Sequence, residues 1–158
     1  ERTILFMNRV YIREMYPEDI PDVTEIERQS FTAPWSETSF RSELYSRYSI
    51  VRIAEFNGIV VGYICVRHMA DECHLLNLAV HPDYRRRGIA KMLIDNVIQE
   101  MRIEGSKFFY LEVRVSDYTA RKLYEGFGFR TIGIRKEYYV NPTEDAVIIM
   151  LEIPEKYR

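Results

Sequence analysis

The sequence has little of what several specialised protein classes require. Its two cysteines, Cys65 and Cys73, are too few for a disulfide framework and lack the spacing of a zinc site. The three histidines, at positions 68, 74 and 81, show no metal-ligand spacing. No apolar run approaches the roughly 20 residues that span a bilayer, and no signal-peptide pattern opens the chain. We therefore expect a cytoplasmic protein that has no metal and no membrane association.

An excess of charge of one sign is also lacking. The chain has 22 Lys+Arg against 24 Asp+Glu, a formal net charge of -2, which argues against a protein that coats nucleic acid through its overall field. Its length of 158 residues is typical of one domain, and it contains no linker, repeat or low-complexity segment. We expect a single domain over 7–158, with residues 1–6 being a tag or an upstream extension.

Apolar periodicity predicts an α/β layered domain. Strands are predicted at 8–14, 49–56, 59–66, 74–80, 107–115, 130–140 and 145–152. Helices are predicted after Asp19, after Ser36, from Gly88 to Gly105, and after Asp117. The Asn57-Gly58 pair is typical of a tight turn between two antiparallel strands. The order β-α-α-β-β-β-α-β-α-β-β indicates a mixed, mostly antiparallel central sheet flanked by helices.

The loop before the third long helix is the first candidate site. Arg85, Arg86, Arg87 and Gly88 lie between a predicted strand and a predicted helix. A helix N-terminus offers free N–H groups and a positive dipole end to an anion, and glycine lets that anion approach the backbone. The alternative is a solvated cluster of arginines. The loop is neither a P-loop nor a dinucleotide fingerprint.

Glu112 is the second candidate. It lies midway along an apolar strand, on the face shared by Phe108, Tyr110 and Arg114. Burying an unpaired carboxylate is costly. Two readings therefore stay open: an ion pair with an arginine such as Arg114 or Arg130, or a general base with a perturbed pKa facing a cleft.

Several aromatic residues and one histidine can each be interpreted either as structural or as functional. Tyr124, on the short helix after Asp117, is either a core aromatic or a phenol that protonates a leaving group. Tyr138 and Tyr139 end a predicted strand and are either packed at a sheet edge or exposed to a ligand. His74 begins a strand and is either structural or part of a cleft.

In order along the chain, these signals resemble one family, the GCN5-related N-acetyltransferases. The resemblance covers the chain from about Arg9 to Leu151. The segments that carry it are Leu78–Pro82, Tyr84–Ala90, Leu111–Arg114, Ser116–Tyr124 and Gly126–Phe129. It implies the fold of that family and an enzyme that uses acetyl-CoA.

The resemblance also implies roles for individual residues. The backbone of Leu78, Ala79 and Val80 would bond the pantetheine arm, and the pyrophosphate would be held by Arg85, Arg86, Arg87, Gly88, Ile89, Ala90 and Lys91. Glu112 would be the general base and Tyr124 the general acid. Tyr138 and Tyr139 would line a peptide slot opposite the loop from Phe31 to Trp35. Asp117 stands where the family usually has asparagine at a cofactor contact, and an ionised carboxylate cannot donate a hydrogen bond there.

Within the family, the chain resembles the branch that acetylates N-terminal amines, which includes bacterial ribosomal-protein acetyltransferases and archaeal N-terminal acetyltransferases. The segments behind this are Pro34–Ser36, Leu111–Arg114, Tyr138–Tyr139 and Glu144–Met150. The implied partner is a protein N-terminus, that of a ribosomal protein among the candidates. We expect a monomer or weak dimer and no nucleic-acid partner.

Two alternatives remain. One is acetylation of a small amine or a lysine side chain; a polycationic amine would favour an acidic cleft, and only Glu43 and Glu137 lie near the expected slot. The other is a non-catalytic module that binds acyl-CoA, or that binds RNA through Arg85–Arg87.

Overall fold

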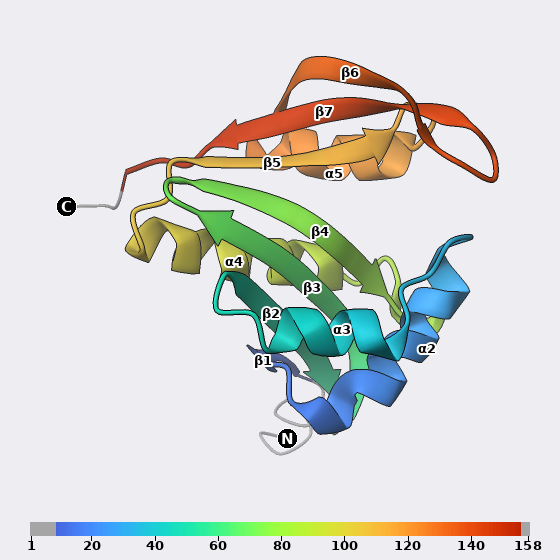
Figure 1. The fold of residues 1–158 in the computed structure, drawn as a ribbon. Helices are drawn as coiled ribbons and strands as arrows, with labels where there is room; N and C mark the ends of the chain where they lie inside the picture. Colours follow the sequence, from blue (N-terminus) through green and yellow to red (C-terminus); the bar gives the residue numbers. More distant parts are fainter. Residues whose placement is uncertain (1–8, 156–158) are drawn as a thin grey trace. The chain divides into compact units, whose positions relative to one another are not determined.

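The computed structural model describes residues 9–155 (Figure 1). The predicted extension at 1–6 and the predicted start of the first strand at Asn8 lie outside this range. The strands are β1 (Val10–Glu14), β2 (Ser49–Phe56), β3 (Ile59–Met69), β4 (Glu72–Val80), β5 (Phe108–Arg114), β6 (Arg130–Tyr139) and β7 (Glu144–Glu152). The helices are α2 (Ile20–Ser30), α3 (Glu37–Leu44), α4 (Ile89–Ile103) and α5 (Tyr118–Phe127), with short 3-10 turns η1 (Pro17–Asp19) and η2 (Pro82–Tyr84). The predicted order of elements is confirmed.

The strands form a mixed, mostly antiparallel sheet, as predicted. Their hydrogen-bonding order is β1-β2-β3-β4-β5-β7-β6. The β1–β2, β2–β3, β5–β7 and β6–β7 pairs are antiparallel, whereas β4 and β5 are parallel. A parallel pair needs a long crossover, and α4 lies in the connection between these two strands.

The chain divides into two compact units. The first comprises the described part of Glu1–Arg67 together with Leu76–Val97, and the second comprises His68–Leu75 with the described part of Ile98–Arg158. Strand β4 and helix α4 therefore contribute residues to both units. The first unit contains the loop before α4, and the second contains β5, α5 and the β6–β7 hairpin.

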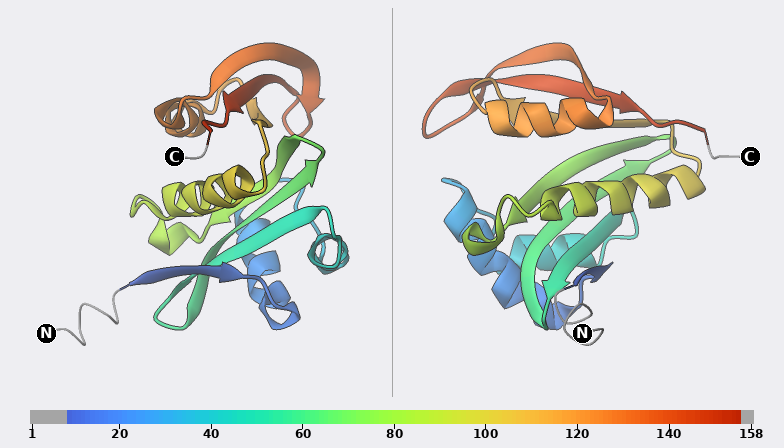
Figure 2. Two further views of the ribbon diagram at one scale, coloured as in Figure 1. Left: turned by 90° about the vertical axis from the view of Figure 1, so that its left-hand side faces the viewer. Right: turned by 180° about the vertical axis from the view of Figure 1, so that it is seen from behind.

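The first unit has its core between β2–β3 and helices α2 and α3. Helix α2 directs Ile20, Val23 and Ile26 to this core, and α3 contributes Phe40. Figure 2 shows α2 and α3 on one side of these strands. The turn between β2 and β3 forms because Asn57 and Gly58 take positive φ angles of 50° and 80°, the geometry of a type I′ turn.

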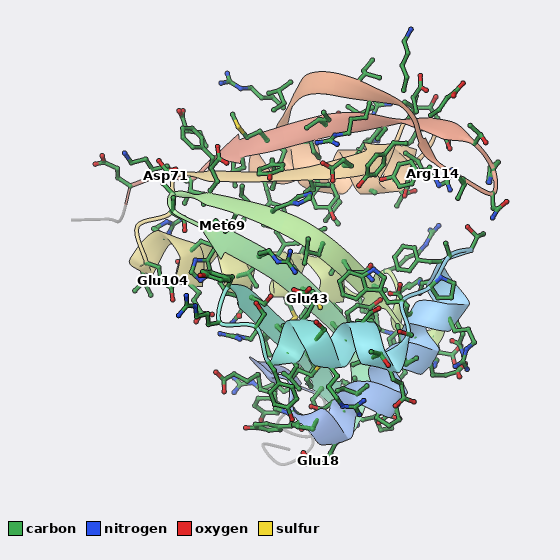
Figure 3. The ribbon with its side chains drawn as sticks, in the orientation of Figure 1. Glu18, Glu43, Met69, Asp71, Glu104 and Arg114 are labelled. Atoms are coloured by element: carbon green, nitrogen blue, oxygen red, sulfur yellow. The ribbon has the colours of Figure 1, made fainter. Side chains whose placement is uncertain are left out.

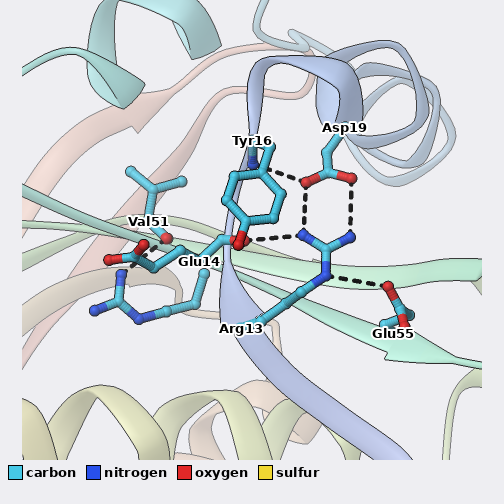
Figure 4. A network of polar contacts seen from close by, with 7 residues as sticks. Arg13, Glu14, Tyr16, Asp19, Val51 and Glu55 are labelled. Atoms are coloured by element: carbon cyan, nitrogen blue, oxygen red, sulfur yellow. Dashed lines mark hydrogen bonds and ion pairs between the residues drawn. The ribbon is translucent and has the colours of Figure 1, made fainter. Parts of the chain in front are cut away.

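A polar cluster fixes the start of α2 (Figure 4). The Arg13 guanidinium donates to both oxygens of Asp19, at 2.9 and 3.1 Å, and its Nε donates to Glu55 at 3.1 Å. The same Asp19 carboxylate accepts the Tyr16 N–H at 2.8 Å. Strand β1 is thereby tied both to β2 and to the turn that leads into α2.

The second unit is built on β5. Its residues alternate between fully and partly buried, with Phe109, Leu111 and Val113 facing the core. Helix α5 lies along the β5–β7 strands (Figure 2). Asp117 caps its N-terminus by accepting the Ala120 N–H at 3.1 Å, and Gly128 ends it with φ at 100°.

Candidate active site

The loop before α4 presents an open backbone surface. Gly88 has φ at 80°, and a Cβ placed on it would meet nothing within 4 Å. Arg86 also has a positive φ, 64°. Helix α4 begins at Ile89, so its first N–H groups lie next to this glycine without partners inside the helix. The exposed cations Arg87 and Lys91 flank it. These features fit the pyrophosphate of coenzyme A.

The side chains of two residues predicted to hold the pyrophosphate, Arg85 and Ile89, are engaged within the protein. The Arg85 Nε donates to the Val80 carbonyl at 2.9 Å, and its Nη2 donates to the Ser30 hydroxyl at 3.2 Å. Arg85 therefore braces the loop against the end of β4 and the end of α2. Ile89 is buried at 2 % exposure, so only its backbone can face a ligand.

Some backbone groups at the end of β4 already have hydrogen-bond partners within the protein. The Asn77 side-chain oxygen accepts the Leu78 N–H at 3.1 Å, and the Val80 carbonyl is bonded to Arg85. The side chains of Ala79 and Val80 are buried. A pantetheine arm bonded along this strand would therefore use the remaining backbone groups or displace the Asn77 contact.

Glu112 lies in a charged cluster of the second unit. Its Oε1 lies 2.7 Å from the His74 Nε2, and its Oε2 lies 3.9 Å from the Arg135 Nε. The ladder between β4 and β5 ends at the pair His74–Tyr110, and these two rings stack with centroids 4.5 Å apart. The ion pair with an arginine is therefore present, but its arginine is Arg135 and not Arg114 or Arg130. Arg114 pairs instead with Glu144, at 3.2 Å.

This cluster sets the charge of Glu112, whose side chain is only 6 % exposed. Burial would raise the pKa of the carboxyl group, but the hydrogen bond and charge of His74, with the charge of Arg135, hold that pKa below its usual range. Glu112 is thus an ionised acceptor at neutral pH, and the pKa change opposes its strength as a base.

Tyr124 is buried at 5 % exposure and packs edge-on against Phe129, with ring centroids 5.4 Å apart. Burial, together with the nearby Asp117 and Tyr139, raises the pKa of its phenol. The group therefore stays protonated at neutral pH and is available as a donor. The Tyr124 ring thus has the surroundings of a core aromatic residue, and its phenol is in the protonated state that a general acid requires.

The predicted substrate residues differ in exposure. Tyr138 is 46 % exposed and Phe31 is 41 % exposed. The Tyr138 and Tyr139 rings meet edge to face with centroids 5.0 Å apart. The Trp35 ring packs on the buried Phe40, with centroids 5.2 Å apart, so this residue also anchors its loop to the core. Asp117 serves as the N-cap of α5, a role that explains a carboxylate at this position.

Sequence reasoning missed the residue that holds the loop from Phe31 to Trp35. Glu27 is 1 % exposed; its carboxylate accepts the Trp35 N–H at 2.9 Å, the Asn77 amide at 2.7 Å and the Tyr63 hydroxyl. The sequence did contain an indication of this role. Glu27 falls on the apolar stripe of α2 formed by Ile20 and Val23, where a charged residue is unexpected.

Among the described residues, no helix is long and apolar enough to cross a bilayer. Within 9–155 there is also no group of three or more His, Cys, Asp or Glu side chains placed to bind a metal ion. Both cysteines are buried free thiols.

Comparison with known proteins decides the family. The sequence model of the acetyltransferase (GNAT) family matches residues 20–129. The chain belongs to the GNAT family. It is therefore an acetyltransferase, and the donor used by this family is acetyl-CoA.

Its relatives are similar along nearly their whole length. The chain is 35% identical over 144 residues to the ribosomal protein bS18-alanine N-acetyltransferase of Escherichia coli K12, covering 90% of this chain and 97% of that one. A crystal structure of the E. coli ribosomal-protein-S18-alanine N-acetyltransferase superposes with a TM-score of 0.87 at 32% identity, covering 95% and 97% of the two chains. Ard1 from Thermoplasma volcanium superposes with a TM-score of 0.83 at 25% identity, covering 92% and 99%.

Proposed function

We propose that this GNAT chain transfers the acetyl group of acetyl-CoA to the N-terminal amine of a protein, with a ribosomal protein as the substrate class. The observation that carries the proposal is Glu112, an ionised carboxylate held on an apolar strand in the same unit as the exposed Tyr138. The names of the relatives support the choice of substrate. The activity would be cytoplasmic, where ribosomal proteins are made.

We expect 7–158 to act as one acetyltransferase domain. The first unit would hold the coenzyme through the N–H groups at Gly88 and the cations Arg86, Arg87 and Lys91. The bound donor supplies an acetyl thioester. A backbone N–H from Leu78, Ala79 or Val80 would polarise its carbonyl, as preorganised donors do in acyl transfer.

The second unit would supply the proton transfers. An α-amino group has a pKa of about 8, so most of the substrate amine must lose a proton before it attacks the thioester. Glu112 would accept this proton, directly or through a water molecule. Because the pKa of Glu112 is lowered, the carboxyl group would then release this proton readily to the solvent.

Tyr124 would give a proton to the departing thiolate. The thiolate of a thiol with a pKa of about 8.5 leaves fairly well without help, and burial makes the Tyr124 phenol a weaker acid. The contribution of Tyr124 should therefore be smaller than that of Glu112.

Single-turnover acetyl transfer to a peptide with a free N-terminus tests both roles. Glu112→Gln keeps the shape of the side chain and removes the acceptor, and we expect the rate to fall by about 10²–10⁴-fold. Tyr124→Phe should cost about tenfold, which is less than the roughly 10²–10⁴-fold that proton transfer usually contributes. Wild-type rates in both variants would reject the assignment.

A further inference from the structure

Arg114, the last residue of β5, joins this strand to the β6–β7 hairpin. It lies on the same face of β5 as Glu112, at the end of the strand next to the hairpin (Figure 3). Its Nη1 donates to the Pro142 carbonyl at 2.9 Å and its Nη2 donates to the Val140 carbonyl at 3.1 Å. Two backbone groups of the connection between β6 and β7 are therefore held by one guanidinium.

The same guanidinium makes two further contacts to the hairpin. Its Nη1 lies 3.2 Å from Glu144 Oε1, and its central carbon lies 4.5 Å from the centre of the Tyr139 ring. The other oxygen of Glu144 accepts the Ser116 N–H at 2.6 Å. Both ends of the hairpin turn are thus tied to the end of β5 and to the segment that follows it.

The hairpin needs such support because its own backbone is irregular. Glu137 and Asn141 have φ angles of 52° and 54°, in the left-handed region that is unfavourable for residues other than glycine. The regular β6–β7 register also shifts between the pairs Arg135–Ala146 and Tyr139–Glu144. The segment that carries Tyr138 and Tyr139 is consequently placed by side chains outside the ladder.

We propose that Arg114 is a positioning residue that fixes the β6–β7 hairpin and so sets the affinity for the acceptor peptide. This inference rests on the proposed function, because it assigns the Tyr138–Tyr139 pair to peptide binding. Arg114 itself does not take part in proton transfer. Its loss should change binding of the peptide and leave the chemical step and the coenzyme loop unaffected.

The chemistry of arginine suits this role better than that of lysine. A guanidinium presents several N–H donors in a rigid fork, whereas an ammonium is a point charge on a flexible stem. Only the fork can reach the carbonyls of Val140 and Pro142 and the Glu144 carboxylate at once. Arg114→Lys should therefore restore the wild-type behaviour only in part.

The test compares Arg114→Met with a matched control, Arg121→Met. Arg121 also belongs to the second unit and also donates to a backbone carbonyl, that of Val115 at 2.9 Å, but its guanidinium lies over Tyr118 on α5. Steady-state kinetics with a peptide bearing a free N-terminus give KM for peptide, KM for acetyl-CoA and kcat. Hydrogen exchange of the amides from 137 to 144 reports on the hairpin without any substrate.

For Arg114→Met we expect the peptide KM to rise by about tenfold or more, with kcat and the acetyl-CoA KM within about threefold of wild type, the pattern of lost uniform binding. Amides of the hairpin should exchange faster while those of β5 stay protected. Arg121→Met should show neither change, and Arg114→Lys should fall between. If Arg114→Met does not fold, Arg114→Lys decides by the same two measurements.

An unchanged peptide KM in a folded Arg114 variant would overturn the inference, and so would a fall in kcat alone. These results differ from a failure of the proposed function itself, in which the wild-type protein would not acetylate the peptide N-terminus at all. In that case the exchange measurement would still show whether Arg114 holds the hairpin.

Discussion

The ionisation of Glu112 determines how acetyl transfer should depend on pH. Its pKa lies below the usual range of a glutamate, because His74 and Arg135 outweigh the effect of burial. The carboxylate is therefore already charged throughout the neutral range. We therefore expect a rise in rate between about pH 6 and 9 to come from deprotonation of the substrate amine, with a pKa of about 8.

This argument predicts that the midpoint of the pH profile belongs to the substrate. Single-turnover rates should be measured against pH for two peptides whose terminal amines differ in pKa. The midpoint should move with the peptide by the same amount as the amine pKa. A midpoint that stays fixed while the peptide changes would mean that an enzyme group controls the profile.

The Asp19 carboxylate should stabilise the fold in a pH-dependent way. Burial would raise its pKa, but the hydrogen bonds from Arg13 and Tyr16 lower it below the usual value. Its contribution is thus present above the pKa of about 3.9 expected in the unfolded chain, and it is lost as the pH falls through the lower folded-state value. We expect Asp19→Asn to reduce the free energy of unfolding by about 1–3 kcal/mol at pH 7.

Urea unfolding at pH 7 and at pH 3 measures this effect. Asp22→Asn is the matched control, because Asp22 is an exposed acid in the first turn of the same helix and shares only the interaction with the helix dipole, about 0.3–1 kcal/mol. The difference between wild type and Asp19→Asn should shrink at pH 3. A difference as large at pH 3 as at pH 7 would contradict the ionic explanation.

Helix α4 and strand β3 approach each other closely at Gly62. A Cβ at this position would lie 3.1 Å from the Ala79 carbonyl oxygen and 3.3–3.4 Å from Leu93 and Ile89. Gly62→Ala should therefore lower the free energy of unfolding by about 1–3 kcal/mol through overpacking. It should also raise the KM for acetyl-CoA, since Ala79 and Ile89 belong to the segments proposed to bind it.

Gly126→Ala is the control for this change. Gly126 lies within α5, and a Cβ there would meet nothing within 4 Å, so alanine should stabilise the helix by about 0.5–1 kcal/mol. Urea unfolding and steady-state kinetics of the two variants provide the comparison. Equal stability of wild type and Gly62→Ala would show that the strand and helix can move apart without cost.

The helices and strands could be predicted from the sequence because each is encoded locally. The Asn57-Gly58 turn, the Ser36 cap and the alternation along β5 depend on residues close together in the chain. The predicted bounds differ from the observed ones by a few residues, as for β3, which continues to Met69. Such extensions depend on pairing with other strands, which local patterns do not report.

The partners within the candidate site could not be predicted in the same way. His74, Glu112 and Arg135 come from three strands, and their contact depends on the register of β4 with β5 and of β6 with β7. The contacts of Arg114 could not be predicted for the same reason. All four depend on the conformation of the connection between β6 and β7, which local sequence patterns do not report. The motif around Glu112 identified the position, and only the fold identified its neighbours.

At the scale of the whole molecule, the family match from 20 to 129 includes residues of both units. Acetylation of a terminal amine, as opposed to a lysine side chain, is the claim on which the substrate assignment depends.

Mass spectrometry of a competition reaction tests that claim most directly. The protein and acetyl-CoA are incubated with a peptide that has a free N-terminus and an internal lysine, together with the same peptide whose N-terminus is blocked. We predict that the acetyl group is found on the terminal residue of the free peptide and that the blocked peptide stays unmodified. Acetylation of the lysine in both peptides at equal rates would contradict the account.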